Sequence, residues 1–334
     1  ADVIVVGNAA PEFEAIVRRG LELLERQGVL QRRHGQGTLV LPRPRRRGQE
    51  ATGRVMVGSY TVGEGGGYLG DIMAGLTGAA GRAGWLVSFS NLMMPAARQE
   101  FFETLGEGEI DGVLLLSFTD RPLVEELVRA WHGPMVMVDH YFEGLPLTGV
   151  IDDSEGGARQ AVEHLLSRGH RRIGYAEVTR RENNPWRYAG YAGALKDAGI
   201  EVDESLVVPT FGSFDGGRRA GEELLEGEDP PTAILAFDDI RAWGIWRAAE
   251  ARGLQVGRDL ALVGFGDGAA KVGLPEELSS VRFNSRLIGR TAVEKLEEIM
   301  TGEGKPGGVV TVPTELVIRE SSSGPAPAGP LGKG

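Results

Sequence analysis

The chain has 334 residues, of which 41% are hydrophobic and 25% charged, and its formal net charge is −11. This composition is typical of a folded protein of two or three domains, and the absence of cysteine excludes disulfides, thiolate metal sites and cysteine nucleophiles. Because no apolar run reaches the ~18 residues of a membrane span and no basic region precedes the apolar start, we expect no signal peptide, no membrane anchor and a cytoplasmic location.

The negative charge is not spread evenly. Residues 1–50 contain nine arginines and six acidic residues, a net charge of +3, whereas residues 51–334 carry −14. An acidic surface repels the phosphates of nucleic acids, so the charge argues against DNA binding only for the second part of the chain.

Residues 1–41 predict a small basic head. Apolar residues between Val17 and Val29 indicate an amphipathic helix that ends at Gly28, and residues 32–41 are predicted to form a β-hairpin that turns through residues 35–37. A basic hairpin arm suits phosphates and the minor groove of DNA, while a helix and hairpin without a DNA role is the alternative. The candidate DNA-binding residues are Arg18, Arg19, Arg32, Arg33, His34, Gly35 and Gly37.

Residues 42–53 predict an exposed basic linker, because prolines at positions 42 and 44 oppose a helix and the neighbouring arginines repel one another. Residues 54–320 alternate short apolar runs with helical periodicity, which is typical of an α/β fold with two doubly wound parallel-sheet subdomains. Residues 321–334 have almost no apolar bulk and predict a disordered tail. The predicted strands cover residues 55–58, 86–89, 112–116, 135–138, 172–175, 233–236 and 261–264, and the predicted helices 68–83, 95–105 and 157–168.

A glycine run at residues 65–70 matches the G-x-G-x-x-G pattern of dinucleotide sites. Six residues separate it from the preceding strand, and the second strand is not followed by the acidic residue that holds ribose hydroxyls. We therefore interpret the run as a loop that enters a helix.

The acidic and histidine residues do not form a recognisable catalytic or metal-binding pattern. The clusters around Asp152 and Asp238 lack the spacing of a calcium loop, the five histidines show no HExxH spacing, and no G-x-S-x-G elbow occurs. Asp153 is interpreted as the cap of a following helix. We expect no enzyme activity, no bound metal and no cofactor.

A series of motifs in one order carries a family resemblance from residue 148 onward. They are Val150–Gly157, His164–Ile173, Arg187–Tyr191, Pro231–Ile234, Phe237–Asp239, Leu262–Asp267 and Glu315–Ser321. Together they resemble the effector-binding core of the LacI/GalR family of transcriptional regulators, and a weaker similarity extends over residues 54–147.

The resemblance implies a type I periplasmic-binding-protein fold, in which two subdomains close on a small effector. It places the N-subdomain at residues 54–150 plus 283–302 and the C-subdomain at residues 151–282 plus 305–320. The chain is expected to cross between the subdomains near residues 149–152, 281–284 and 302–307. It also implies a homodimer, a DNA operator and a sugar or related metabolite as partners.

The effector-binding candidates follow from the resemblance and from positions at strand ends. Arg187 matches the family's ligand-clamping arginine, whose rigid fork suits paired hydroxyls or a carboxylate. Asp139 ends a strand at the edge where open α/β sheets bind ligands. Phe214 is interpreted as the aromatic residue under the ligand, with core packing as the alternative.

Asp238 and Gly266 depart from the family's usual Asn and Asp, and Asp267 is interpreted as a structural turn residue. Tyr60 and Asn91 are candidates from their positions at strand ends.

The head resembles the recognition helix and wing of GntR-type winged-helix repressors. A GntR-type head on a LacI/GalR-type core is the arrangement of arabinose-type repressors. A full winged helix has two further helices before this one, and Glu12 and Glu14 stand where DNA contacts are expected. The head is therefore either truncated or degenerate.

We predict from the sequence an effector-responsive, DNA-binding transcriptional regulator that senses a small molecule, most simply a sugar, in the cleft between the two subdomains. The alternative is a solute-binding protein of a sugar transport system. A sugar-converting enzyme is a third hypothesis, which the lack of a catalytic pattern disfavours.

Overall fold

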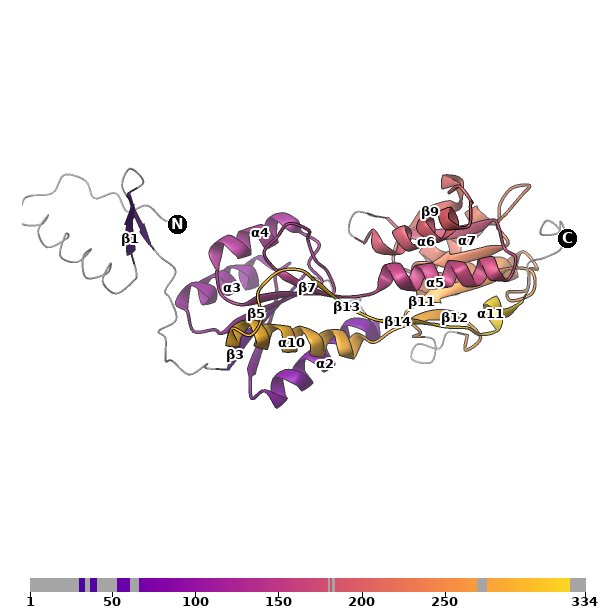
Figure 1. Ribbon diagram of the computed structural model, residues 1–334. Helices are drawn as coiled ribbons and strands as arrows, with labels where there is room; N and C mark the ends of the chain where they lie inside the picture. Colours follow the sequence, from indigo (N-terminus) through magenta and orange to yellow (C-terminus); the bar gives the residue numbers. More distant parts are fainter. Residues whose placement is uncertain are drawn as a thin grey trace, which may run out of the picture.

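The computed structural model describes residues 30–33, 37–40, 53–60, 66–179, 181, 184–268 and 275–324. Arg18, Arg19, His34, Gly35 and most of the predicted linker lie outside these residues. The described chain forms two α/β subdomains, each built on one six-stranded sheet, which lie end to end (Figure 1). Among the described helices, none is long and apolar enough to cross a membrane.

The N-subdomain contains a fully parallel sheet in the order β13-β7-β6-β5-β3-β4. Its strands are β3 (Arg54–Ser59), β4 (Leu86–Asn91), β5 (Gly112–Leu116), β6 (Met135–Val138), β7 (Thr148–Asp152) and β13 (Val309–Val312). Its helices are α2 (Gly66–Arg82), α3 (Pro95–Glu107), α4 (Arg121–Ala130) and α10 (Ser285–Thr301). As expected, the glycine run leads into a helix, because α2 begins at Gly66.

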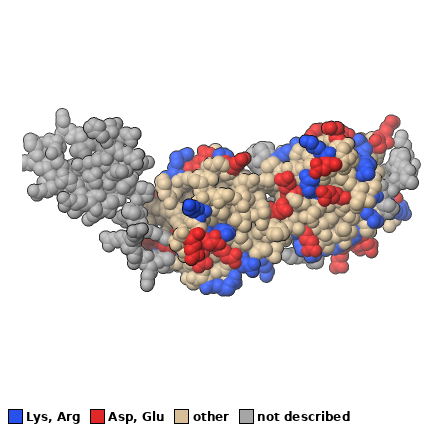
Figure 2. All heavy atoms as spheres, in the orientation of Figure 1, with Lys and Arg blue, Asp and Glu red and all other residues tan. Residues whose placement is uncertain are grey.

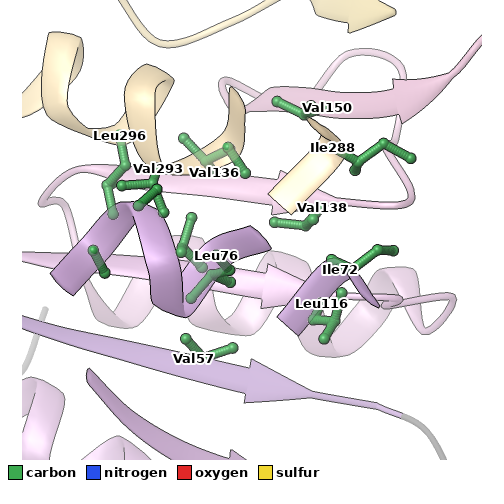
Figure 3. Packing of buried hydrophobic residues seen from close by; sticks show 14 of the residues in the cluster. Val57, Ile72, Leu76, Leu116, Val136, Val138, Val150, Ile288, Val293 and Leu296 are labelled. Carbon is green, nitrogen blue, oxygen red and sulfur yellow. The ribbon is translucent and has the colours of Figure 1, made fainter. Parts of the chain in front are cut away.

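Both faces of this sheet are buried, which explains why its strands are continuous apolar runs. On one face, α2 and α10 pack on alternate strand residues such as Val57, Leu116 and Val138 (Figure 3). On the other face, α3 and α4 pack on the intervening residues, such as Val113 and Met137.

The C-subdomain sheet has the order β14-β12-β11-β10-β8-β9, and only β14 runs antiparallel to its neighbour. Its strands are β8 (Ile173–Val178), β9 (Val207–Thr210), β10 (Ala233–Ala236), β11 (Ala261–Phe265), β12 (Ser279–Phe283) and β14 (Thr314–Val317). Its helices are α5 (Ser154–Ser167), α6 (Trp186–Asp197), α7 (Phe214–Leu224), α8 (Asp239–Ala251), the short α11 (Glu320–Ser323) and the 3-10 turn η2 (Glu204–Leu206). Helices α5 and α6 cover one face and α7 and α8 the other.

The described chain crosses between the subdomains three times. The first crossing joins β7 to α5 and the second joins β12 to α10, close to the predicted positions. The third lies at Pro313, between β13 and β14, and not at residues 302–307 as predicted. The glycines at 302–308 form a turn that returns the chain to the same sheet, where β13 pairs with β7. The N-subdomain therefore continues to Val312.

The prediction of a disordered tail from residue 321 is wrong for its first residues. Ser321 and Ser322 are fully buried in α11. The Ser321 hydroxyl donates to the carbonyl of Leu262 (2.6 Å), and the Ser322 hydroxyl donates to Ser279 (2.7 Å). Buried hydroxyls with hydrogen-bond partners hold this segment in place of apolar side chains. Residues 325–334 lie outside the described residues.

In the head, two antiparallel strands lie where the hairpin was predicted, with Gly37 in the second strand and not in the turn. Strand β1 (Leu30–Arg33) pairs antiparallel with β2 (Gly37–Val40), and Arg33 stands opposite Gly37. Arg32 and Arg33 therefore belong to the first arm of the hairpin.

The predicted cap at Asp153 is also confirmed. Its carboxylate accepts a hydrogen bond from the backbone amide of Gly156 (3.0 Å) and caps α5. We expect Asp153→Ala to lower the free energy of unfolding by about 1 kcal/mol, because one amide at the helix start loses its acceptor. Urea unfolding measures this change. An unchanged midpoint would show that the cap contributes nothing, whereas Asp153→Asn should retain most of the stability.

Candidate ligand-binding site

The carboxyl ends of the two sheets face each other. Strands β7 and β12 each end where the chain leaves for the other subdomain, so both sheets point these ends toward the junction. Both sheets also change winding direction here, between β3 and β5 in one and between β8 and β10 in the other. Open α/β sheets bind ligands at such switch points.

Arg187 lies on α6 at the C-subdomain side of the junction and is 8% exposed. Its guanidinium donates to the carbonyl oxygen of Phe237 (2.6 Å) and to the hydroxyl of Ser154 (3.3 Å), and it stacks on the rings of Phe237 and Phe265. Its Nη2 lies 3.7 Å from a carboxylate oxygen of Asp152. These contacts fix the orientation of the fork while leaving Nη2 without a hydrogen bond at ordinary distance to any described residue.

Asp139 follows β6 on the N-subdomain side, with its backbone in the left-handed region (φ 69°). Its carboxylate accepts hydrogen bonds from the hydroxyls of Ser117 (2.6 Å) and Tyr68. The pKa of Asp139 is raised to about 6, mainly by burial and also by the nearby Asp152, while the two hydroxyls and Arg187 act in the opposite direction.

These charges come from opposite subdomains and are close enough to act on one another. Arg187 lowers and Asp152 raises the pKa of both Asp139 and Tyr68. The Tyr68 ring also contacts the ring of Phe283 at the second crossing, with centroids 4.8 Å apart. The structure thus brings the predicted Arg187 and Asp139 together across the junction, with two carboxylates around one arginine.

Asp238 serves as a helix cap. Its carboxylate accepts from the backbone amide of Arg241 (2.8 Å) at the start of α8 and pairs with the Arg241 guanidinium. Arg241 is 3% exposed and also donates to the hydroxyl of Thr210 (2.6 Å). The oxygens of Asp238 are therefore largely committed to Arg241.

Tyr60 and Asn91 lie farther from this centre. The Tyr60 hydroxyl donates to Asp120 (3.0 Å), and this hydrogen bond is the main cause of its raised pKa. Asn91 ends β4, the edge strand three positions from β6, and its side chain accepts from the amide of Met93 (3.1 Å). Asn91 is exposed and forms a turn at the sheet edge.

Phe214 is half-buried at the start of α7, where its ring lies 6.2 Å from that of Trp243. Phe211 directly follows β9 at the carboxyl edge of the sheet and is 73% exposed. Phe211 is thus better placed than Phe214 to offer an aromatic face to a ligand. Phe211 could have been found in the sequence only from its position directly after β9, and the apolar periodicity did not predict that strand.

Ser117, Tyr68 and Asp152 were not among the predicted site residues. Ser117 immediately follows the predicted strand 112–116, so the strand-end argument that found Asp139 applied to it as well. Asp152 was noticed only as part of an acidic cluster. Tyr68 lies on a helix, and no local pattern places its hydroxyl against Asp139.

Asp267 is a structural residue, but it pairs with arginines, whereas the sequence suggested a cap of the following turn. Its carboxylate pairs with Arg282 and Arg319, each at 2.6 Å, and so joins the turn after β11 to β12 and to the segment after β14. Gly266 beside it adopts φ 129°.

The described residues contain no cluster of His, Asp and Glu able to hold a metal ion. On the face shown in Figure 2, acidic and basic side chains are interspersed over both subdomains. That face presents no uniformly basic surface of the kind that DNA phosphates require.

Comparison with known proteins gives consistent results. The family described as "Periplasmic binding protein-like domain" matches residues 162–322. The HTH-type transcriptional regulator DegA of Bacillus subtilis is 29% identical over 236 residues, 69% of either chain. The structure of the transcriptional regulator CelR–cellobiose complex superimposes with a TM-score of 0.72 and 26% identity over 94% of this chain and 92% of that one. The structure of a LacI-family regulatory protein from Chloroflexus aggregans superimposes with a TM-score of 0.71 and 29% identity, over 80% of this chain and 98% of that one.

Proposed function

We propose that the chain is a LacI-family transcriptional regulator with a periplasmic-binding-protein-like domain, and that it senses a small uncharged sugar held between its two subdomains. The observation that carries this proposal is the pair Arg187 and Asp139, which come from opposite subdomains and lie close enough for Arg187 to lower the pKa of Asp139. A ligand that bonds to both would favour one relative position of the subdomains over others.

The charges at this site favour a neutral ligand. Arg187 is already opposed by Asp152 and Asp139, so a phosphate or carboxylate would meet two negative groups and one arginine whose charge those groups already balance. Sugar hydroxyls can donate to the carboxylates and accept from Nη2 of Arg187. The exposed ring of Phe211 offers an apolar face to a sugar ring. A similar structure was solved with cellobiose, which supports a sugar as the ligand.

A thermal-shift screen of neutral mono- and disaccharides, including cellobiose, against their phosphorylated forms tests this assignment. We expect a neutral sugar to raise the melting temperature. A shift given only by phosphorylated compounds would overturn the charge argument, and a shift given by neither class would overturn the choice of a sugar.

We infer that the full regulator is a homodimer that binds an operator through its head. The basic hairpin of β1 and β2 is the candidate wing, and the candidate contacts remain Arg18, Arg19, Arg32, Arg33, His34, Gly35 and Gly37. The acidic core would then act as the sensor, and a change in the relation of its subdomains would be passed to the DNA-binding part.

The edge of the N-subdomain sheet suits a dimer contact. Strand β4 lies at this edge, and exposed apolar residues surround it, which we call the β4 patch: Met73, Leu86, Phe89, Met93 and Met94, exposed by 36 to 68%. Apolar groups gathered at an open strand edge are typical of a surface that a partner covers. We propose a second copy of the chain as that partner.

Introducing Leu86→Asp together with Phe89→Asp is expected to raise the dimer dissociation constant at least about tenfold, because two charges would be buried in an apolar interface. Sedimentation equilibrium measures this constant. The matched control is Val309→Asp, on β13 at the opposite edge of the same sheet, where the side chain is 41% exposed. Equal effects of the two changes would place the interface elsewhere.

A further inference from the structure

Aromatic residues of the two subdomains meet directly beside the site. Trp186, the first residue of α6 in the C-subdomain, stacks on Tyr141 of the N-subdomain with ring centroids 5.3 Å apart and planes 21° apart. The ring of His140 meets Trp186 edge-on at 5.4 Å and lies 4.7 Å from Phe142. We call His140, Tyr141 and Trp186 the interdomain aromatic cluster.

Each half of the cluster is fixed to its own subdomain. On the N-subdomain side, Gly149 of β7 leaves no room for a side chain, because a Cβ there would overlap Tyr141, and His140 is 6% exposed. On the C-subdomain side, α6 is packed tightly on α5, where a Cβ on Gly190 would overlap the backbone of Glu155. Neither half can move without its subdomain, so the contact depends on how the two subdomains are placed.

The cluster also lies next to Arg187 and Asp139, the two charged residues of the proposed ligand site. Trp186 precedes Arg187 and His140 follows Asp139, so each half of the contact is one peptide away from one member of the pair. A shift of Trp186 relative to His140 would therefore change the separation of Arg187 from Asp139.

We propose that the interdomain aromatic cluster holds the two subdomains in one relative placement, and that Trp186 is a positioning residue that sets the separation of Arg187 from Asp139. The consequence for ligand affinity rests on the proposed function, whereas the consequence for subdomain placement does not. Loss of two ring contacts corresponds to a roughly two- to tenfold change in the balance between subdomain arrangements.

Pulsed dipolar electron paramagnetic resonance on the full chain tests this without any ligand. The chain contains no cysteine, so Arg129→Cys on α4 and Arg219→Cys on α7 would carry the only two spin labels, one in each subdomain. We expect Trp186→Ala to broaden or shift the distance distribution. The matched control, Trp243→Ala, removes a tryptophan whose ring contact is with Phe214 inside the C-subdomain and should leave the distribution unchanged.

Tyr141→Ala provides a second route, because it breaks the same contact from the other subdomain. It should reproduce the effect of Trp186→Ala, and the double variant should add little to either single change. A distribution that matches the parent in both single variants, with circular dichroism showing a folded chain, would overturn the proposal. So would an equal change in the Trp243→Ala control.

A second arm uses the neutral sugar that gives a thermal shift, and Trp186→Ala should bind it two- to tenfold more weakly. An unchanged affinity would remove the positioning role of Trp186. If no sugar binds the parent, the proposed function fails, and the distance measurement still decides whether the aromatic cluster holds the subdomains.

Discussion

Replacing Arg187 with alanine is expected to lower ligand affinity at least about 100-fold, effectively abolishing binding in a thermal-shift or calorimetric titration. The guanidinium is held by the Phe237 carbonyl, the Ser154 hydroxyl and the rings of Phe237 and Phe265, which leaves Nη2 as the donor for a ligand. Removing a buried, hydrogen-bonded charge from a binding site costs 2–5 kcal/mol or more, of which about 2.7 kcal/mol corresponds to 100-fold.

The same change should lower stability, because Asp152 is only 6% exposed and would lose its opposing charge. A buried pair broken on one side costs about 3 kcal/mol. Titrations should therefore be made well below the melting temperature of the variant. Arg159→Ala is the matched control, since Arg159 pairs with Asp197 at the surface of α5 in the same subdomain. Undiminished binding by Arg187→Ala would refute the role assigned to this residue.

Replacing Asp139 with asparagine is expected to stabilise the protein at pH 7.5 by about 1–3 kcal/mol. The pKa of this carboxyl is raised from 3.8 to about 6 in the folded chain. The folded state therefore binds the proton more tightly than the unfolded state, and Asp139 costs stability as the pH rises from about 4 to about 6. Above pH 6 the full destabilisation by the ionised Asp139 is present. The pKa shift corresponds to about 3 kcal/mol, which is an upper limit because solvent partly screens a side chain that is not fully buried.

Urea unfolding of parent and variant at pH 4 and pH 7.5 measures this prediction. The advantage of Asp139→Asn should be present at pH 7.5 and nearly vanish at pH 4, where the parent carboxyl is protonated. Asp229→Asn, at an exposed position, should show no such dependence. An equal difference at both pH values would contradict the assignment. A more stable but less responsive variant is the expected result of removing a charge that the ligand uses.

The sequence predicted the alternating architecture well, because buried parallel strands are continuous apolar runs. Strands β5, β6 and β10 have the predicted bounds. Strand β9 was not predicted because Pro209 interrupts its apolar run, and without this strand the position of Phe211 at a strand end was not visible. The third crossing was misplaced because glycines signal a turn but not the sheet to which the chain returns.

The site was predicted only in part, for a similar reason. Arg187 came from a motif and Asp139 from a strand end, and both lie at the junction. Asp238 directly precedes a helical stretch, and an aspartate in that position is typical of a helix cap. Its hydrogen bond with the amide of Arg241 could therefore have been predicted from the sequence. The contacts of Tyr68 and of the interdomain aromatic cluster join residues 45 to 71 positions apart, which no local pattern encodes.

The central claim is that a sugar bound between the subdomains changes the affinity of this regulator for DNA. It is tested most directly by fluorescence anisotropy on DNA recovered by selection with the full chain, titrated with the sugar that gives the largest thermal shift. We expect that sugar to change the DNA dissociation constant about fivefold or more in the parent and not in Arg187→Ala. A sugar that stabilises the parent yet leaves its DNA dissociation constant unchanged would contradict the claim.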